Sequence, residues 1–334
     1  MGFLIAGGIG FIGSHTYISL RKRFPNARLV IVDNLTTSTI QTLNSLMEVI
    51  GDSIVFHQLD LCDEQAVEHL FNRYHFHGIL HFAGYKAVEE SVVNPLKYYM
   101  NNIQGTLNLV KQCLHYKIER FIFSSSATVY GNGKSPFKES DSLLPASSPY
   151  GQTKAICERI LQDVAYANPW LRVSLLRYFN PIGAHESGLI GESPTSLPSN
   201  LMPYITKVAK GELPILKIFG GDYPTLDGTA VRDYIHVMDV AEGHVAALEH
   251  ARRGAHIYNL GTGRGTSVLQ LVRAFEQVNG IKVPYQIVER RPGDLASVYA
   301  DVHKTESELQ WKANRTIENM CRDAWNFEKR NILI

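Results

Sequence analysis

The sequence predicts an α/β protein built on a doubly wound parallel sheet, followed by a smaller mixed α/β domain. Over the first 180 residues, short apolar runs alternate with amphipathic stretches, which is the rhythm of repeated strand–helix–strand units. After residue 180 this rhythm breaks, and glycine and proline become frequent. We therefore predict one domain over residues 1–180 and a second over residues 181–334, with a segment near 232–262 returning to pack on the first.

The individual elements follow from the spacing of apolar residues. Short apolar runs predict strands at residues 3–6, 28–32, 53–58, 78–81, 119–124 and 171–177. Between them, apolar residues recur three and four positions apart and predict helices at residues 11–24, 63–74, 95–116 and 150–167. Because strands joined through a helix run in the same direction, the predicted sheet is parallel.

Composition and charge exclude several classes of protein. The 334 residues are 45% hydrophobic and 19% charged, which is typical of a globular chain of roughly two domains. Its apolar runs are far shorter than the roughly 18 residues that cross a membrane, so no membrane partner is expected. Lys and Arg outnumber Asp and Glu by only 33 to 32, which argues against nucleic acid as a partner.

Cysteines and histidines give no sign of a metal or a disulfide framework. Cys62, Cys113, Cys157 and Cys321 lie far apart without a Cys-x-x-Cys pair, which favours free thiols in a reducing compartment. The thirteen histidines lack the spacing of a metal site, so no metal is expected. The chain opens on an apolar run without a charged leader or cleavage site, and a cytoplasmic location is expected.

The turn after the first predicted strand is rich in glycine. Residues 7–13 read GGIGFIG, and Gly7, Gly10 and Gly13 recur every third position between a strand and a helix. Such a turn lets backbone N–H groups approach a diphosphate at a helix N-terminus, where the helix dipole favours anions. Glycines in a turn can also be simple loop residues, so the pattern gains weight from its strand–helix context. That context predicts a Rossmann-type dinucleotide site.

Two carboxylates near the following strands refine this prediction. Asp33 lies twenty residues after Gly13, at the end of the second predicted strand, where a carboxylate accepts the ribose hydroxyls of a dinucleotide. The same charge would repel a 2′-phosphate, which favours NAD over NADP as the cofactor. Asp60 follows the third predicted strand and could reach the adenine, although it could equally cap the helix that begins near Asp63.

A second cluster has the residue types of an acid–base site. Tyr150 and Lys154 are four residues apart at the start of a predicted helix and therefore share one face. A tyrosine titrates near 10, so it serves as a base at neutral pH only if a nearby cation stabilises the phenolate. An exposed tyrosine and a solvated lysine are the alternative. The hydroxyls of residues 124–126 end the fifth predicted strand, at the sheet edge where doubly wound folds bind ligands, and they favour a site.

These motifs together resemble those of the extended short-chain dehydrogenase/reductases. The resemblance includes the glycine turn, HFAGYKAV at 81–88, SSSATVYG at 124–131 and the Tyr150/Lys154 pair. Longer segments are similar to the UDP-glucose 4-epimerase family in particular. They read RYFNPIGAH at 177–185, SNLMPY at 199–204, DYPTLDGTAVRDYIH at 222–236 and YNLGTG at 258–263. The resemblance runs over nearly the whole chain.

The resemblance implies an isomerase that inverts the 4-hydroxyl of UDP-hexoses such as UDP-galactose and UDP-glucose. Tyr150 would take the proton from this hydroxyl while a hydride passes to NAD, and the resulting 4-keto sugar would turn over and be reduced on its other face. Ser126 would hydrogen-bond the 4-oxygen as charge develops. Lys154 would bind the nicotinamide ribose and lower the pKa of Tyr150. Such an enzyme belongs to carbohydrate metabolism, in particular galactose metabolism.

The resemblance also implies two sets of binding residues. For the cofactor NAD they are Gly7, Gly10, Phe11, Ile12, Gly13, Asp33, Asn34, Asp60, Leu61, Phe82, Ala83, Gly84, Lys86, Asn101, Ser124, Tyr150, Lys154 and Phe179. For the UDP-sugar they are Lys86, Ser126, Tyr150, Asn180, Asn200, Leu201, Lys217, Ile218, Phe219, Arg232, Tyr234, Arg291, Asp294 and Val298.

Three of the sugar-side residues carry a further argument. Arg232 and Arg291 offer forked donors suited to a diphosphate, although each could instead form a surface ion pair, for instance Arg232 with Asp233. Phe219 could be plain core. Val298 stands where a bulky family residue restricts the pocket to glucose and galactose, so its smaller side chain predicts some activity on UDP-N-acetylhexosamines as well.

Other functions compete with an epimerase. A sugar-nucleotide 4,6-dehydratase would need an Asp-Glu pair where this chain has Ala127 and Thr128, so it lacks the acid and base for elimination. Another sugar-nucleotide-modifying enzyme of the family, or a non-catalytic NAD-binding sensor of the same fold, is a further alternative. The presence of Ser126, Tyr150 and Lys154 together argues against a sensor. A homodimer is expected, through the helices at 95–116 and 150–167 that pair in the family.

Overall fold

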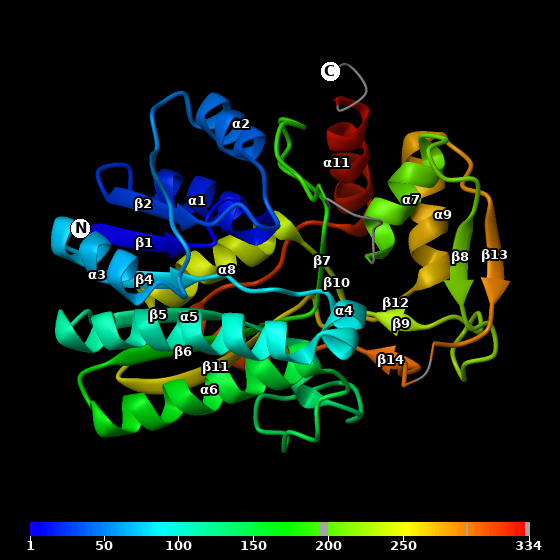
Figure 1. The fold of residues 1–334 in the computed structure, drawn as a ribbon. Coiled ribbons are helices and arrows are strands. Elements are labelled where there is room, and N and C mark those ends of the chain that lie inside the picture. Colours follow the sequence, from blue (N-terminus) through cyan, green and yellow to red (C-terminus); the bar gives the residue numbers. More distant parts are fainter. Residues whose placement is uncertain (194–199, 292, 331–334) are drawn as a thin grey trace.

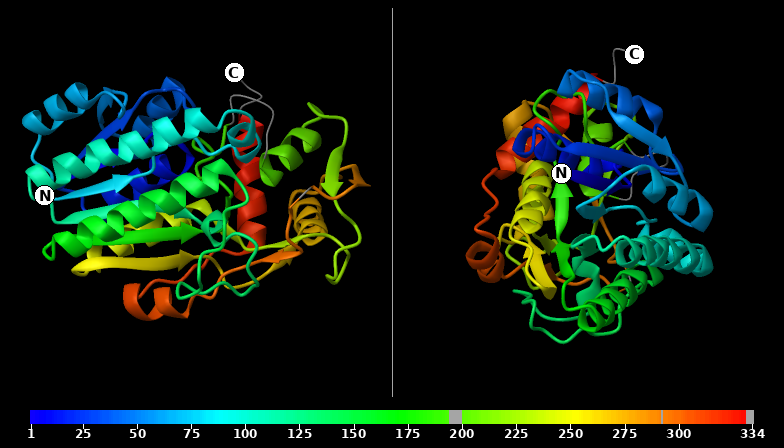
Figure 2. Two further views of the ribbon diagram at one scale, coloured as in Figure 1. Left: turned by 60° about the horizontal axis from the view of Figure 1, so that its bottom comes forward. Right: turned by 90° about the vertical axis from the view of Figure 1, so that its left-hand side faces the viewer.

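A computed structural model describes residues 1–193, 200–291 and 293–330. Its main feature is a parallel seven-stranded sheet in the order β11-β6-β5-β4-β1-β2-β3, with helices on both faces (Figures 1 and 2). The strands are β1 (Gly2–Ala6), β2 (Arg28–Asp33), β3 (Val55–Gln58), β4 (Gly78–His81), β5 (Arg120–Ser126), β6 (Arg172–Tyr178) and β11 (Gly254–Leu260). The doubly wound fold class predicted from the sequence is confirmed.

The two faces of the sheet are buried by different helices. Side chains alternate along each strand, so Phe3 and Ile5 of β1 join one core cluster while Leu4 and Ala6 join the other. The first face is covered by α1 (Phe11–Arg23), α2 (Ile40–Ile50) and α8 (Val237–Glu249). The second is covered by α3 (Glu64–Arg73), α5 (Pro95–His115) and α6 (Pro149–Ala167).

The predicted elements agree with the observed ones apart from their ends and a few omissions. Strand β5 runs to Ser126 because its ladder with β6 continues to the pair Ser126 and Tyr178. The helix predicted from residue 63 begins one residue later, because Asp63 is its N-cap and accepts the N–H of Ala66 at 3.0 Å. Helices α2 and α4 (Val88–Val93) were not predicted; α4 is too short to display a clear period.

One strand of the main sheet comes from the C-terminal half of the chain. β11 lies at residues 254–260 and pairs in parallel with β6 along its whole length. Just before it, α8 packs against α1 on the first face of the sheet. The chain therefore crosses back from the second region to complete the sheet beside β6, while the boundary at residue 180 stays a prediction.

The remaining elements form a smaller region beyond the carboxyl ends of the strands (Figure 1). Its helices α7 (Leu201–Ala209), α9 (Val268–Asn279) and α11 (Ile317–Arg330) share a separate hydrophobic core. α10 (His303–Leu309) instead packs against β11 and α8. The smaller region also holds two two-stranded sheets and one three-stranded sheet, built from β7 (Asn180–Ile182), β8 (Leu216–Phe219), β9 (Val231–Arg232), β10 (Tyr234–His236), β12 (Thr266–Ser267), β13 (Tyr285–Val288) and β14 (Ser297–Val298). This region stands over the edge of the main sheet where the predicted site residues gather.

The described part of the chain also bears on membrane and metal partners. Among these residues, no helix is both long and apolar enough to cross a membrane. They hold no group of three or more His, Cys, Asp or Glu side chains placed to bind a metal ion. Cys62, Cys113, Cys157 and Cys321 are free thiols.

Candidate active site

In the glycine turn, the backbone lies so close to neighbouring atoms that side chains at Gly7 and Gly13 would not fit. Gly7 has a φ of +77°, and a Cβ there would lie 2.5 Å from the backbone nitrogen of Ala83. A Cβ on Gly13 would lie 2.3 Å from the carbonyl oxygen of Gly7. Helix α1 starts at Phe11 behind Gly10, which offers no side-chain cap, so its first N–H groups face outward without an intrahelical acceptor. This cradle fits the diphosphate of a dinucleotide.

Asp33 and Asp60 lie at the carboxyl ends of the neighbouring strands β2 and β3. Asp33 accepts the N–H groups of Ile9 at 3.4 Å and of Leu35 at 3.0 Å, so its carboxylate stands beside the glycine turn. Burial raises the pKa of Asp33, and its hydrogen bonds oppose that rise. Asp60 accepts the N–H of Cys62 at 2.8 Å and lies 3.5 Å from the Asn34 amide. The alternative that Asp60 caps α3 is wrong, because Asp63 holds that position.

Tyr150 and Lys154 both lie on the inner face of α6, against the end of β5. Each is only 5% exposed, so the alternative of an exposed tyrosine and a solvated lysine is wrong. The Lys154 ammonium donates to the carbonyl oxygen of Ser124 at 2.7 Å and stands 4.8 Å from the ring of Phe123. Ser126 is buried in the same place, where its hydroxyl accepts the Thr128 hydroxyl at 3.0 Å and lies near the Tyr150 phenol.

Burial dominates the electrostatics of this pair. It raises the pKa of Tyr150 well above its ordinary value of 10, and the nearby Ser126 hydroxyl opposes the rise. Burial also lowers the pKa of Lys154 to about 8. In the protein alone, burial outweighs any lowering by Lys154, whose ammonium is bound to the Ser124 carbonyl, and the expected lowering of the Tyr150 pKa by Lys154 stays a prediction. In this state the phenol keeps its proton at neutral pH.

Two further side chains of the site escaped the sequence analysis. Tyr178 ends β6 opposite Ser126, and its hydroxyl lies close to Ser124 and Tyr150. Its place at the carboxyl end of a strand was the signal that could have revealed it. His244 comes from α8, and its Nε2 lies 3.3 Å from the Ser124 hydroxyl. Burial lowers the pKa of His244 to about 4, so it is neutral at pH 7. Nothing local in the sequence marks His244.

The arginines predicted for the sugar side have acidic neighbours. Arg232 forms an ion pair with Asp294 and donates to the Leu295 carbonyl at 3.0 Å. The alternative pairing of Arg232 with Asp233 is wrong, since Asp233 is fully buried and accepts the N–H of Thr262 at 2.8 Å. A guanidinium held by one carboxylate keeps further N–H donors for another anion.

Arg291 and Phe219 lie together. The Arg291 guanidinium stands 4.1 Å from the Phe219 ring and 3.9 Å from the Glu89 carboxylate. Phe219 is therefore partly exposed beneath an arginine and is not plain core. In contrast, Ile218 and Tyr234 are buried in the core of the smaller region, which leaves little of either side chain for a ligand.

The remaining sugar-side residues surround the same edge of the sheet. Lys86 and Asn200 both bind the carboxylate of Glu192, at 2.8 and 2.6 Å, and Glu192 was not predicted. Val298 is half-buried, pairs with Arg232 between β14 and β9, and packs beside Phe179. Asn180 begins β7, and Lys217 is exposed on β8. Ser199 of the motif at 199–204 lies outside the described residues.

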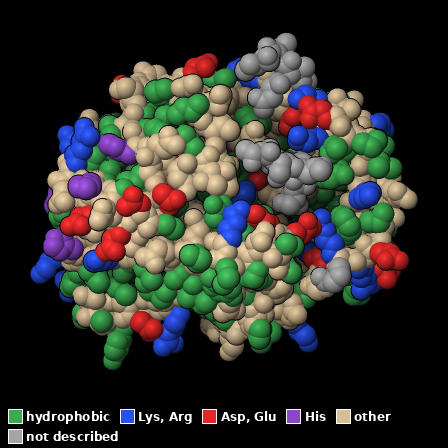
Figure 3. All heavy atoms as spheres, in the orientation of Figure 1, with side chains coloured by type: hydrophobic (Ala, Val, Ile, Leu, Met, Phe, Trp, Pro, Cys, Tyr) green, Lys and Arg blue, Asp and Glu red, His purple; other side chains and the backbone are tan. Residues whose placement is uncertain are grey.

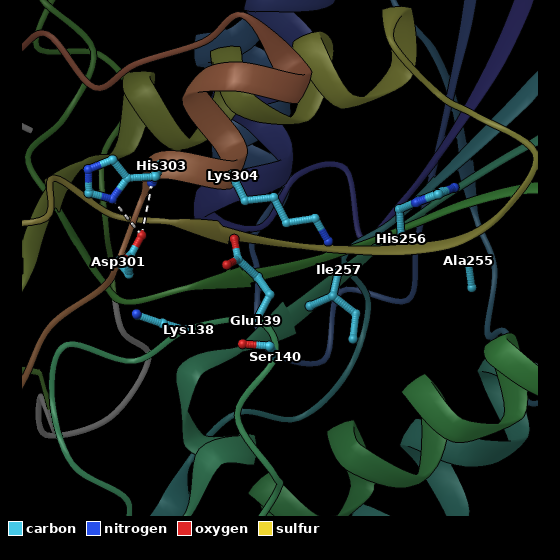
Figure 4. A pocket seen from close by; sticks show the side chains of 9 residues that line it. All are labelled: Lys138, Glu139, Ser140, Ala255, His256, Ile257, Asp301, His303 and Lys304. Atoms are coloured by element: carbon cyan, nitrogen blue, oxygen red, sulfur yellow. Dashed lines mark hydrogen bonds and ion pairs between the residues drawn. The ribbon is translucent and has the colours of Figure 1, made fainter.

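A separate pocket of about 660 Å³ lies away from these residues, along β11. Figure 4 shows its lining, in which His303 turns toward Asp301 and Lys304 extends over the pocket toward Ile257. The structure brings no residue of the predicted cofactor or sugar sets into this pocket. We therefore place the candidate active site at the edge between the main sheet and the smaller region, and not in this pocket.

Known proteins are similar to this chain in both fold and sequence. A model of the NAD dependent epimerase/dehydratase family matches residues 3–261. The chain is 50% identical to a UDP-glucose 4-epimerase of Bacillus subtilis, over 99% of this chain and 98% of that protein.

Solved structures agree with the sequence comparison. A UDP-glucose 4-epimerase from Bifidobacterium longum, in complex with NAD+ and UDP, superposes with a TM-score of 0.95 at 45% identity, covering 99% of each chain. A UDP-glucose-4-epimerase from Stenotrophomonas maltophila, with bound NAD and formylated UDP-arabinopyranose, gives a TM-score of 0.96 at 45% identity. That match covers 100% of this chain and 99% of the other.

Proposed function

This chain belongs to the NAD dependent epimerase/dehydratase family, and from this premise we propose that it interconverts UDP-galactose and UDP-glucose by inverting the sugar 4-hydroxyl. The observation that carries the proposal is the buried cluster of Ser126, Tyr150 and Lys154 beside the glycine turn. A hydroxyl donor, a phenol and an ammonium meet there at the carboxyl edge of a parallel sheet. Such an activity would serve galactose metabolism.

The cofactor is NAD, and the residues of the turn suit it. The first-turn N–H groups of α1 would hold the diphosphate, and the Asp33 carboxylate would accept the ribose hydroxyls. Lys154 would hold the nicotinamide ribose from the inner face of α6. When bound, NAD would supply a reversible hydride acceptor for C4 of the sugar and a positive charge in its oxidised form.

Tyr150 would move the proton of the 4-hydroxyl. As the phenolate, its Oη would take this proton in the first half of the reaction and become the phenol, and it would return the proton in the second half and become the phenolate again. Because burial raises the pKa of Tyr150, the base form needs positive charge close by, and the Lys154 ammonium is the cation that α6 provides one turn away. Ser126 would donate to the 4-oxygen, where negative charge grows.

The smaller region would hold the UDP end of the substrate. The Arg232 and Arg291 guanidiniums are suited to the diphosphate. Asn200 and Lys86, which share the Glu192 carboxylate, belong to the same predicted set of sugar-side residues. Val298 lies beside Arg232, and we extend the proposal to UDP-N-acetylhexosamines because valine leaves more room than a bulky residue at this point. Elimination of water is not favoured, since Ala127 and Thr128 provide no acid–base pair.

The decisive experiment is to incubate the purified chain with UDP-galactose, first without and then with added NAD, and to separate the products by chromatography. UDP-glucose is the expected product, and its formation without added NAD would mean that the cofactor is retained. A parallel incubation with UDP-N-acetylgalactosamine tests the wider substrate range. If UDP-galactose stays unchanged even with NAD, the epimerase proposal fails and the non-catalytic sensor becomes the better hypothesis.

We also propose a homodimer formed through α5 and α6. On α5, the apolar side chains of Leu96, Met100, Ile103 and Leu107 follow each other at intervals of four, three and four residues. Leu96 and Met100 are 72% and 71% exposed. Figure 3 shows hydrophobic side chains gathered over this part of the molecule. A repeat of this kind suits helix pairing with a second copy.

The location of the protein is part of the same proposal. We propose the cytoplasm, because the four cysteines are free thiols and Cys113, Cys157 and Cys321 are buried. Such cysteines suit a reducing compartment.

A further inference from the structure

A buried ion pair stands directly behind the reactive residues. Glu158 of α6 and Arg177 of β6 are each 1% exposed. The Arg177 Nε lies 3.0 Å from Glu158 Oε1, and Nη2 lies 2.6 Å from Oε2, so the guanidinium binds the carboxylate in a bidentate manner through two parallel hydrogen bonds. The Ser125 hydroxyl donates a third hydrogen bond to Glu158. The mechanism described above uses none of these three side chains.

The three residues are the immediate neighbours of those that do the chemistry. Glu158 follows Lys154 by four residues and so lies one helical turn away on the same face of α6. Ser125 stands in β5 between Ser124, whose carbonyl accepts the Lys154 ammonium, and Ser126. Arg177 directly precedes Tyr178 in β6. The ion pair therefore joins α6 to the two strands whose ends form the site.

Stability alone does not account for this arrangement. Removing two charges from water costs several kcal/mol per ion, and well-packed apolar residues are often as good or better in such places. Within the described chain, Arg177 Nη1 is buried and has no hydrogen-bond acceptor. Arg177 also stacks 4.7 Å from the Tyr130 ring. An ion pair that leaves one donor unsatisfied is better explained by what it does to its neighbours.

We infer that Glu158, which is hydrogen-bonded to Arg177 and Ser125, is a positioning residue for Lys154 and Tyr150. The ion pair sets the rotation of α6 against β5 and β6, and it keeps a negative charge one turn from the Lys154 ammonium. This inference rests on the proposed function, because it assigns Glu158 a part in holding the acid–base pair of that reaction.

The charge of Glu158 matters because Lys154 is buried. Burial lowers the pKa of Lys154 to about 8, and the Glu158 carboxylate works in the opposite direction. Without this carboxylate, Lys154 would lose its proton at a lower pH. The other titratable or charged groups around Lys154 and Tyr150 are Cys157 on α6, His81 on β4, Arg177 and Tyr178 on β6, and Tyr98 on α5.

The test compares three variants with the unchanged protein. Glu158→Gln removes the charge and keeps the shape. In the pH profile of kcat for UDP-galactose, the decline at high pH, here called the high-pH limb, should therefore move down by about one pH unit. KM should change little, since Glu158 does not touch the sugar-side residues. Glu158→Asp keeps the charge on a shorter side chain, so kcat should fall while the limb stays near its original pH.

A double variant separates this role from folding. Glu158→Gln alone leaves Arg177 as an unpaired buried charge and could destabilise the protein. Glu158→Gln with Arg177→Met leaves no such charge, so its Tm should approach that of the unchanged protein while the limb remains shifted. If the double variant folds normally and its limb coincides with that of the unchanged protein, the inference is wrong.

A second readout does not depend on catalysis. The rate of Lys154 acetylation by acetic anhydride, mapped by peptide mass spectrometry across pH, follows the fraction of free amine. The midpoint should fall in both variants that lack the Glu158 carboxylate, and an unchanged midpoint would overturn the inference. If the unchanged protein does not convert UDP-galactose but the acetylation midpoints shift, the proposed function fails while the positioning of Lys154 by Glu158 stands.

Discussion

At the scale of single residues, the site balances burial against charge. Tyr150 is placed where its phenolate is unfavourable, and Lys154 where its ammonium is unfavourable, so each depends on its neighbours to reach the reactive form. The Ser126 hydroxyl already lies near the phenol, and the Ser124 carbonyl already accepts the ammonium. Little rearrangement is then needed when the sugar hydroxyl arrives, which is the condition for efficient proton transfer.

Replacing Tyr150 by Phe removes the hydroxyl that we propose moves the proton, and it keeps the ring. We expect kcat for UDP-galactose to fall by about 10²- to 10⁴-fold, the usual contribution of a general base. Chromatography of timed samples measures this rate. Tyr166→Phe on the exposed side of α6 is the matched control and should leave kcat unchanged. Equal rates for Tyr150→Phe and the unchanged protein would contradict the role of the phenol.

Replacing Val298 by Tyr should narrow the range of sugars. Val298 neighbours Arg232 and packs against Phe179, so a larger ring there would take up space beside the predicted sugar site. Turnover of UDP-N-acetylgalactosamine should drop by at least about tenfold, while turnover of UDP-galactose stays within a few-fold. Comparable turnover numbers for the two proteins on the N-acetylated substrate would rule out Val298 as a determinant of specificity.

At the scale of elements, α6 connects several functions of the molecule. Its inner face carries Tyr150, Lys154 and Glu158, and Asn102 of α5 donates to Thr153 at 3.1 Å. Helix α5 in turn carries the apolar stripe of Leu96, Met100, Ile103 and Leu107, in which Ile103 packs partly on the core and the other three are exposed. Pairing with a second copy would therefore cover α5 and brace the helix that holds the acid–base pair.

Charges introduced into this stripe should keep the chain monomeric. Leu96→Glu with Met100→Glu would place carboxylates in the proposed interface, where they would have no partner. Light scattering coupled to size exclusion should then give a mass near 37.4 kDa, in place of about twice that value for the unchanged protein. Leu226→Glu, on an exposed loop of the smaller region, is the control. A variant that remains dimeric would exclude this face as the interface.

At the scale of the whole molecule, buried histidines tie folding to pH. Burial lowers the pKa of His15 and His81 to about 3, and that of His244 to about 4. In the unfolded chain these rings bind protons near pH 6.5, so between pH 6.5 and 4 the unfolded state binds more protons than the folded one. The contribution of these three histidines to the stability of the folded state is therefore fully present above pH 6.5 and is lost as the pH falls.

The expected result is a steep loss of stability in mild acid. Three histidines together should lower the free energy of unfolding by about 4 kcal/mol per pH unit between pH 6 and 5. Urea denaturation at a series of pH values measures this slope. His15→Gln should reduce it by about a third, and His303→Gln, at an exposed position, should leave it unchanged. A flat stability profile across this range would show that the rings are not buried in neutral form.

Much of the fold was already determined by the sequence itself. Short apolar runs located β1 and β4, which are buried along their whole length, and apolar spacing located α1 and α5, all to within a residue or so. The glycine turn could also be predicted from the sequence, since only glycine fits where the backbone at Gly7 and Gly13 approaches its neighbours. Tyr150 and Lys154 could be paired because helical spacing is a local property.

Other features were decided only by the tertiary structure, because they depend on residues far apart in the chain. β11 joins β6 across more than seventy residues, and His244 reaches Ser124 from a helix that no local pattern links to it. The partner of Arg232 proved to be Asp294, whereas the adjacent Asp233 is buried elsewhere. The ionisation of Tyr150 and Lys154 was also beyond the sequence, because a pKa depends on burial and on neighbouring charges that only the folded chain brings together.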